Sequence, residues 1–101
     1  MSAAMRLARA YGVAVSFADL GDWGGAQLFS EYDPRGPSIR INERVARRLR
    51  GAALRAFVAL AVAHEIYHHR ERIGEIAVLP DRAAREGEAA RYARDVLRGL
   101  G

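Results

Sequence analysis

Residues 64–68 read His-Glu-Ile-Tyr-His, and they follow an apolar run that extends from Leu54 to Ala63. The apolar side chains and the two histidines recur at steps of three and four residues, which predicts a helix rather than a strand. Two histidines four residues apart on a helix lie on the same face, so both imidazoles can bind one metal ion at about 2.0–2.1 Å. The segment therefore predicts a helix over roughly 52–70 that is built around a metal site.

One face of this helix combines apolar side chains with the two histidines. It consists of Phe57, Leu60, Ala61, His64 and His68, and its periodicity predicts that it points to the core. Burial of ionisable groups on a helix face costs free energy unless something pairs with them, and a metal ion would do so. Glu65 lies about 100° around the helix from His64, so its carboxylate would reach a water on the metal without being a ligand. A zinc hydrolase with Glu as general base has this arrangement; the alternative is a helix with ordinary surface histidines.

The third ligand has to come from another part of the chain. A catalytic zinc site generally has three protein ligands, and the chain contains no cysteine, so the third is His or a carboxylate. His69 follows His68 directly and points about 100° away from it. A last helix, predicted over 82–98, has an apolar stripe of Ala89, Ala93, Val96 and Leu100. Helix phase places Glu86 on that stripe and Glu88 to its side, so we favour Glu86 as the ligand and keep Glu88 as the alternative.

Two further parts of a hydrolytic site are left open by the sequence. The donor for a developing oxyanion could be Tyr67, His69 or Tyr92, and nothing in the sequence chooses among them. A strand over Ser38–Ile41, if it is the edge strand beside the metal helix, would bind an extended peptide by strand addition. Two His and one Glu suit Zn²⁺ best and also permit Mn²⁺.

The other segments predict a small α+β domain. Helices are expected over 2–11, 43–50 and 82–98, and strands over 13–18, 26–32 and 38–41. Asp33-Pro34-Arg35-Gly36 is a strong turn, so the last two strands form a hairpin, and Pro37 marks a strand start or an edge. Asn42 and Asp81 are expected N-caps. We therefore expect one domain over 1–101, with about three strands in an antiparallel or mixed sheet packed on the metal helix and the C-terminal helix.

Length and charge narrow the classes of function. The 101 residues suffice for a single modest core, the apolar run is too short to cross a bilayer, and no signal peptide is evident. We therefore expect a cytoplasmic protein with no membrane partner.

The net charge is +4, and the chain contains 16 arginines and no lysine. A cluster before the metal helix (Arg44, Arg47, Arg48 and Arg50) predicts a solvated helix face; direct nucleic-acid binding is the alternative, without a known motif to support it.

Four motifs in order resemble the ImmA/IrrE family of zinc metallopeptidases. They are Tyr11-Gly12-Val13-Ala14-Val15, Ile39-Arg40-Ile41-Asn42, the "AHE..HH" segment Ala63–His69, and the "E.EA..YA" helix from Glu86 to Leu97. The resemblance covers nearly all of the chain. Many zincins share HExxH, whereas the ordered set of four motifs is far more specific.

The resemblance implies a minimal zincin-like fold and a reaction. It implies that His64, His68 and Glu86 are the ligands and that Glu65 is the catalytic base. It also implies that the chain cleaves a helix-turn-helix transcriptional repressor, as in stress responses. The chain departs from the family at Ala90, where an Asn or Asp commonly stands and could orient a metal-bound His.

Three hypotheses follow from the sequence. The leading one is a zinc-dependent endopeptidase that acts on a DNA-binding repressor. The second is a catalytically weak or inactive metal-binding module that sequesters a regulator or contacts nucleic acid through its arginines. The third is an ion that serves only to stabilise a small domain.

Overall fold

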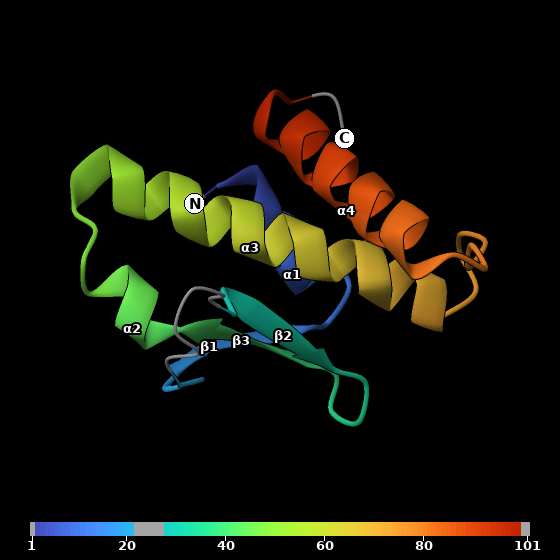
Figure 1. Cartoon of the computed structure of the whole chain (residues 1–101), viewed down its shortest axis with the longest axis horizontal. Helices are drawn as coiled ribbons and strands as arrows, with labels where there is room; N and C mark the ends of the chain where they lie inside the picture. The colour runs from blue at the N-terminus through green and yellow to red at the C-terminus, as the bar shows by residue number, and fades with distance from the viewer. Residues whose placement is uncertain (1, 22–27, 100–101) are drawn as a thin grey trace.

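A computed structural model describes residues 2–21 and 28–99 of the chain. Its elements are α1 (Ala3–Ala10), β1 (Ala14–Ala18), β2 (Ser30–Asp33), β3 (Ser38–Asn42), α2 (Glu43–Ala46), α3 (Gly51–Arg72) and α4 (Arg82–Leu97). In Figure 1 the long helix α3 lies between the sheet and α4, and α1 also packs against α3. The chain thus has the α+β class expected from its sequence, with a three-stranded mixed sheet.

The central strand of the sheet is β3. It pairs antiparallel with β2, as the predicted hairpin requires, and parallel with β1. The expectation that Ser38–Ile41 is an edge strand is therefore wrong, because β1 occupies its second side with Val15 opposite Ile39. Pro37 directly precedes β3. Of its two expected positions, a strand start or an edge, it therefore occupies the strand start. The edge strand that contacts α3 is β2.

Several predicted elements have different ends. The second strand was predicted over 26–32 and is observed from Ser30. Residues 28–29 are not in the strand, and residues 26 and 27 lie outside the described part of the chain. Helix α2 stops at Ala46 instead of residue 50. Helix α3 continues two residues past its predicted end, to Arg72, and the chain then turns at Gly74, whose φ is 78°. Glycine adopts this left-handed conformation without strain, so the turn can close one residue after the C-cap.

Buried Asn42 joins three segments of the chain. Its side-chain oxygen accepts a hydrogen bond from the Arg44 backbone N–H (3.1 Å), as expected of an N-cap, and another from Leu20 (3.3 Å). Its amide nitrogen donates to the carbonyl oxygens of Gly21 (3.2 Å) and Leu28 (2.8 Å). These bonds satisfy the polar atoms of a fully buried amide. They also hold Leu28 in place just before β2.

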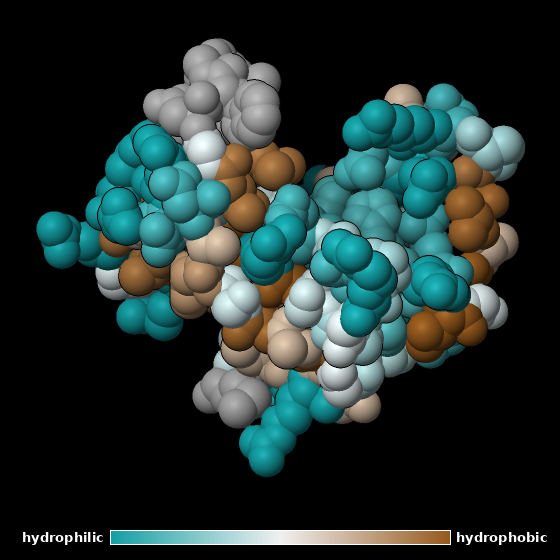
Figure 2. Space-filling view, turned by 90° about the horizontal axis from the view of Figure 1, so that it is seen from below, coloured by the Kyte–Doolittle hydropathy of each residue, from teal (hydrophilic) through white to brown (hydrophobic). Residues whose placement is uncertain are grey.

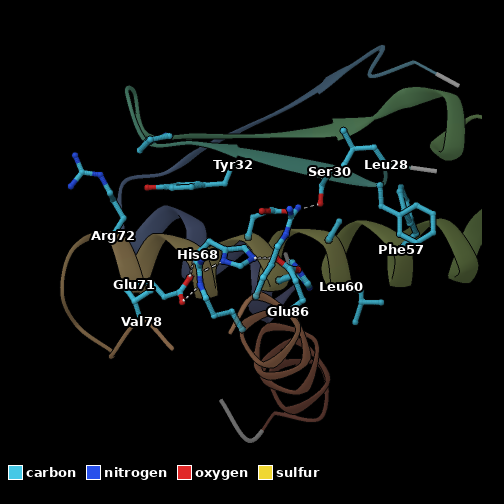
Figure 3. Close-up of a pocket in the computed structure, with 17 residues that line it drawn as sticks. Leu28, Ser30, Tyr32, Phe57, Leu60, His68, Glu71, Arg72, Val78 and Glu86 are labelled. Carbon is cyan, nitrogen blue, oxygen red and sulfur yellow. Dashed lines mark hydrogen bonds and ion pairs between the residues drawn. The ribbon is translucent and has the colours of Figure 1, made fainter. Parts of the chain in front are cut away.

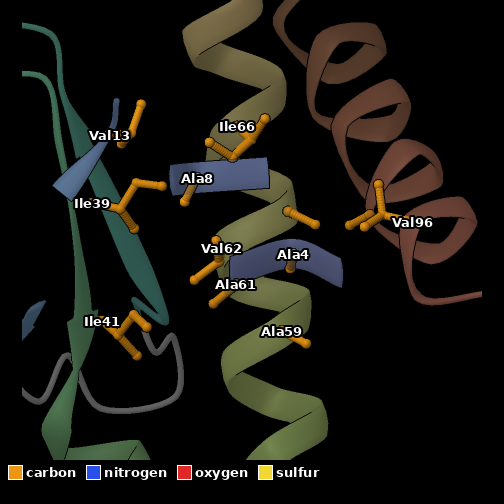
Figure 4. Packing of buried hydrophobic residues seen from close by; sticks show 12 residues of the cluster. Ala4, Ala8, Val13, Ile39, Ile41, Ala59, Ala61, Val62, Ile66 and Val96 are labelled. Atoms are coloured by element: carbon orange, nitrogen blue, oxygen red, sulfur yellow. The ribbon is translucent and has the colours of Figure 1, made fainter. Parts of the chain in front are cut away.

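The core lies between β3 and α3 and continues on the other side of α3 (Figure 4). Ile39 and Ile41 of β3 and Val62 and Ile66 of α3 are all fully buried. Burial of each such side chain contributes about 1.5–3 kcal/mol. The other helices contribute mainly alanines, namely Ala4 and Ala8 of α1 and Ala89 and Ala93 of α4. Small side chains allow helices to pack closely.

The surface is dominated by hydrophilic side chains. The face seen in Figure 2 is mostly hydrophilic, and its hydrophobic residues lie in small separate groups. Among the described residues, no helix combines the length and the apolar character that crossing a membrane requires.

Candidate metal centre

The face of α3 that carries the histidines lines an open cavity of about 1000 Å³ (Figure 3). Phe57, Leu60, Ala61, His64 and His68 all contribute to its wall, so the predicted grouping on one face is confirmed. The expectation that this face points to the core holds only for part of it: Ala61 is 6% exposed and belongs to the core, whereas Leu60 is 42% exposed and both histidines are only partly buried. Helix periodicity identifies which side chains share a face, but not whether another element covers that face.

Two histidines and one glutamate converge in the middle of this cavity. His64 Nε2 lies 3.0 Å from Glu86 Oε2, and His68 Nε2 lies 3.4 Å from Glu86 Oε1. One ligand atom from each of the three residues lies within 4.8 Å of the other two. Donors of a tetrahedral zinc site lie about 3.4 Å apart, because each is about 2.0–2.1 Å from the ion. The separations of 3.0 and 3.4 Å therefore suit a single ion bound between the three side chains.

Helix phase explains why Glu86 reaches the histidines and Glu88 does not. Ala89, Ala93 and Val96 of the predicted stripe are buried, and Leu100 lies outside the described residues. Glu86 continues this stripe at the first turns of α4, where its side chain is 49% exposed beside the cavity. Glu88 points elsewhere, and its carboxylate lies 3.9 Å from Arg91 Nη1. The structure thus groups Glu86 with His64 and His68 and leaves Glu88 apart.

Glu65 is buried next to this group and is held by the sheet. Its side chain accepts a hydrogen bond from Ser30 Oγ to Oε2, at 2.7 Å, and the residue is 7% exposed. Burial raises the pKa of Glu65 above its ordinary value, although the Ser30 hydrogen bond opposes this shift. The carboxyl is therefore more basic than an exposed one. Sequence reasoning missed Ser30, although alternation along the predicted strand could have placed it on one side with two other cavity residues, Leu28 and Tyr32.

A second glutamate, Glu71, orients His68. Its Oε1 lies 2.8 Å from His68 Nδ1, and its side chain is only 3% exposed. Arg85 of α4 donates to both of its oxygens, at 3.1 and 3.3 Å. Burial alone would raise the pKa of Glu71, but the hydrogen bonds from Arg85 and His68 outweigh it and lower the pKa. An ionised carboxylate only accepts, so His68 donates its Nδ1–H to Glu71 and turns the Nε2 lone pair toward Glu86.

Glu71 is thus the residue whose carboxylate orients His68. Sequence reasoning missed it because residue 71 lies just beyond the predicted end of the metal helix. The available signal was its spacing, since a residue three positions after His68 lies on the same helix face. Glu71 is the first of the two residues by which α3 extends beyond its predicted end.

The three candidates for an oxyanion donor lie outside the cavity wall. His69 is buried on another side of α3, where its Nδ1 lies 2.7 Å from the hydroxyl of Tyr32. Its ring also meets the ring of Tyr11 edge to face, and burial lowers its pKa. Tyr67 and Tyr92 pack against each other with ring centroids 6.0 Å apart. Besides the proposed ligands, the polar side chains that line the wall are Ser30, Tyr32, Glu65, Glu71, Arg72, Arg82 and Arg85.

The arginine cluster before α3 is partly neutralised. Arg44 binds Asp19 through two hydrogen bonds of 2.5 and 3.0 Å, and Arg47 binds Glu43 at 2.9 Å. Two of the four arginines thus have carboxylate partners on the same surface. This arrangement agrees with a solvated helix face.

Compared with known protein families, curated proteins and solved structures, the chain matches none. The assignment of a function therefore depends on the geometry of the metal centre and on the motifs in the sequence.

Proposed function

We propose that this protein is a zinc-dependent endopeptidase of the cytoplasm, with His64, His68 and Glu86 as metal ligands and Glu65 as general base. The observation that carries the proposal is the convergence of the two Nε2 atoms on the Glu86 carboxylate, at 3.0 and 3.4 Å. Among the described residues, this is the only group of three such side chains close enough to share an ion. An ion bound there would polarise a scissile carbonyl and make a water molecule more acidic.

The residues around the donors fit a metal ion. Glu71 keeps the proton of His68 on Nδ1, which leaves Nε2 free to act as a ligand. His₂Glu without cysteine is a ligand set of hydrolytic zinc sites, and it also accepts Mn²⁺. The ligand side chains are 15–49% exposed, so a substrate has access to the centre.

Glu65 has the position and the basicity of a proton carrier. Ser30 binds its Oε2, which leaves Oε1 for the attacking water. Since burial raises its pKa, the carboxylate takes a proton more readily at neutral pH than an exposed one would. It then passes this proton to the amine that leaves.

An extended peptide has a binding edge beside the centre. β2 is an edge strand of the sheet, and its residues Ser30 and Tyr32 line the cavity. Backbone groups on the outer edge of such a strand can pair with a substrate chain. This arrangement supports a polypeptide substrate, and the motifs shared with the ImmA/IrrE family favour a helix-turn-helix repressor.

Metal content and cleavage together test the proposal. Purified protein is expected to bind one equivalent of zinc, measured by elemental analysis, and His64→Ala and Glu86→Ala are expected to lose it, while Glu88→Gln retains it as the matched control. Glu65→Gln is expected to keep the metal and to cleave a repressor encoded beside the gene about 10²–10⁴-fold more slowly. A Glu65→Gln variant that cleaves as fast as wild type contradicts the mechanism.

A further inference from the structure

The two ends of the cavity have opposite chemical character. Figure 3 shows Leu28, Phe57 and Leu60 at one end, Arg72 and Val78 at the other, and His68 and Glu86 between them. The metal centre thus lies between an apolar end and a basic end. This asymmetry affects which side chains of an extended peptide fit on either side of the bond that is cut. The inference rests on the proposed function, in which the substrate is an extended peptide.

The apolar end is formed by residues that remain exposed. Leu28, Phe29 and Leu60 are 40%, 53% and 42% exposed, and all three line the cavity with Phe57. The rings of Phe29 and Phe57 meet edge to face with centroids 5.8 Å apart. Large apolar side chains that remain exposed together in a concave site are typical of a ligand-binding surface. A bulky apolar or aromatic side chain would bury this surface.

The cavity wall contains two arginines without a carboxylate partner. Three arginines line the wall, Arg72, Arg82 and Arg85, and only Arg85 is paired within it, with Glu71; Figure 3 places Arg72 at the end opposite the apolar residues. Within the part of the chain that the structure describes, Arg72 and Arg82 form no ion pair with a carboxylate, and both are exposed. Their guanidinium groups are available to a carboxylate of another molecule.

The spacing along α3 relates both ends to the cut bond. Leu60 and Arg72 each lie six residues from the midpoint of the His64–His68 pair, which is about 9 Å along a helix axis. An extended peptide advances about 3.3 Å per residue. Each end of the cavity would therefore contact side chains of the peptide that lie about two or three residues away from the bond at the metal centre.

From these observations we infer that the cleft selects peptides with a bulky apolar side chain on one side of the cut bond and an acidic side chain on the other. The expected preference has two parts, because one end of the cavity offers apolar surface area and the other end offers unpaired positive charge. Peptides with a basic residue in place of the acidic one are disfavoured, since Arg72 and Arg82 would repel it.

Binding of synthetic peptides tests this inference apart from catalysis. The probes are fluorescein-labelled peptides with a central Ala-Ala, two Phe on one side and two Glu on the other, made in both orders. Matched probes carry Lys in place of Glu, or Ser in place of Phe. Affinity for Glu65→Gln, which should not cut them, is measured by fluorescence anisotropy with and without zinc. One order is expected to bind about tenfold more tightly than its Lys and Ser counterparts.

Variants then assign the two flanks to the two ends. Joint replacement of Arg72→Glu and Arg82→Glu is expected to remove the preference for Glu over Lys, whereas Arg94→Glu, an exposed site on α4, leaves it intact. Joint replacement of Phe29→Ser and Leu60→Ser is expected to remove the preference for Phe, with Phe17→Ser, an equally exposed site on β1, as control.

The outcomes separate this inference from the proposed function. Equal binding of the Glu and Lys peptides, or equal effects of the cavity and control variants, overturns the inference. A binding preference without any cleavage by zinc-loaded wild type supports the selectivity of the cleft and counts against the peptidase. Cleavage of the Glu and Lys peptides at equal rates supports the peptidase and overturns the inference.

Discussion

At the scale of single residues, Glu71 determines which nitrogen of His68 faces the metal centre. We expect Glu71→Gln to weaken zinc binding about 10–100-fold, as loss of a carboxylate partner of a ligating His does in other sites. Competition against a chromophoric chelator measures this affinity. The matched control is Glu88→Gln, a glutamate of α4 that lies outside the metal group. Equal zinc affinities of the two variants would show that Glu71 has no part in orienting His68.

Ser30 has a corresponding role for Glu65. We expect Ser30→Ala to lower the free energy of unfolding by about 1–3 kcal/mol at neutral pH, because it leaves a buried carboxylate oxygen without its hydrogen bond. Urea unfolding of the metal-free protein measures the change. Ser16→Ala, at an exposed position of β1, is the control and is expected to change stability by less than about 0.5 kcal/mol. A Ser30→Ala variant as stable as the control would mean that solvent replaces this hydrogen bond.

At the scale of elements, the packing of α4 on α3 brings Glu86 to the histidines. Ala89 is fully buried one turn after Glu86. We expect Ala89→Leu to cost about 1–3 kcal/mol of stability through overpacking, and also to weaken zinc binding because α4 moves away from α3. Urea unfolding and zinc titration measure the two effects. Ala83→Leu, on the exposed side of α4, is the control, and zinc binding unaffected by Ala89→Leu would show that Glu86 does not depend on this packing.

The ion pair between Arg85 and Glu71 connects the same two helices. Arg85 precedes Glu86 directly, so the pair anchors the first turns of α4 beside His68. One carboxylate thereby serves two purposes, since it orients His68 and restrains the helix that carries Glu86. The proposed metal centre and the α3–α4 contact are in this way a single structural unit.

At the scale of the whole molecule, metal binding and folding are expected to be coupled. An ion that binds only the folded chain stabilises it by about 2.7 kcal/mol at a free concentration 100 times the Kd. For a domain of this size each kcal/mol raises Tm by about 4–8 °C. We therefore expect zinc to raise Tm by about 10–20 °C and a chelator to reverse the change, as measured by thermal melting followed by circular dichroism. His64→Ala is expected to show no response to zinc, and an equal response in that variant would place the ion elsewhere.

Local patterns in the sequence predicted much of this protein. Helix periodicity placed His64, His68 and Glu65 on α3 and distinguished Glu86 from Glu88, because the phase of a helix depends only on spacing. Capping and turn residues such as Asn42 and Asp81 located helix starts, since their hydrogen bonds join near neighbours. The predictions failed where the outcome depends on distant segments.

The tertiary structure alone decided what surrounds those residues. It placed β3 in the centre of the sheet and β2 at the edge, because β1 pairs with β3 from a distant part of the sequence. It left most of the histidine face of α3 open to a cavity, with Ala61 also in the core, since no element covers that face completely. It also brought Arg85 and Ser30 to the proposed metal residues. The sequence by itself determined which side chains share a face, whereas long-range packing determined what that face contacts and how accessible it is.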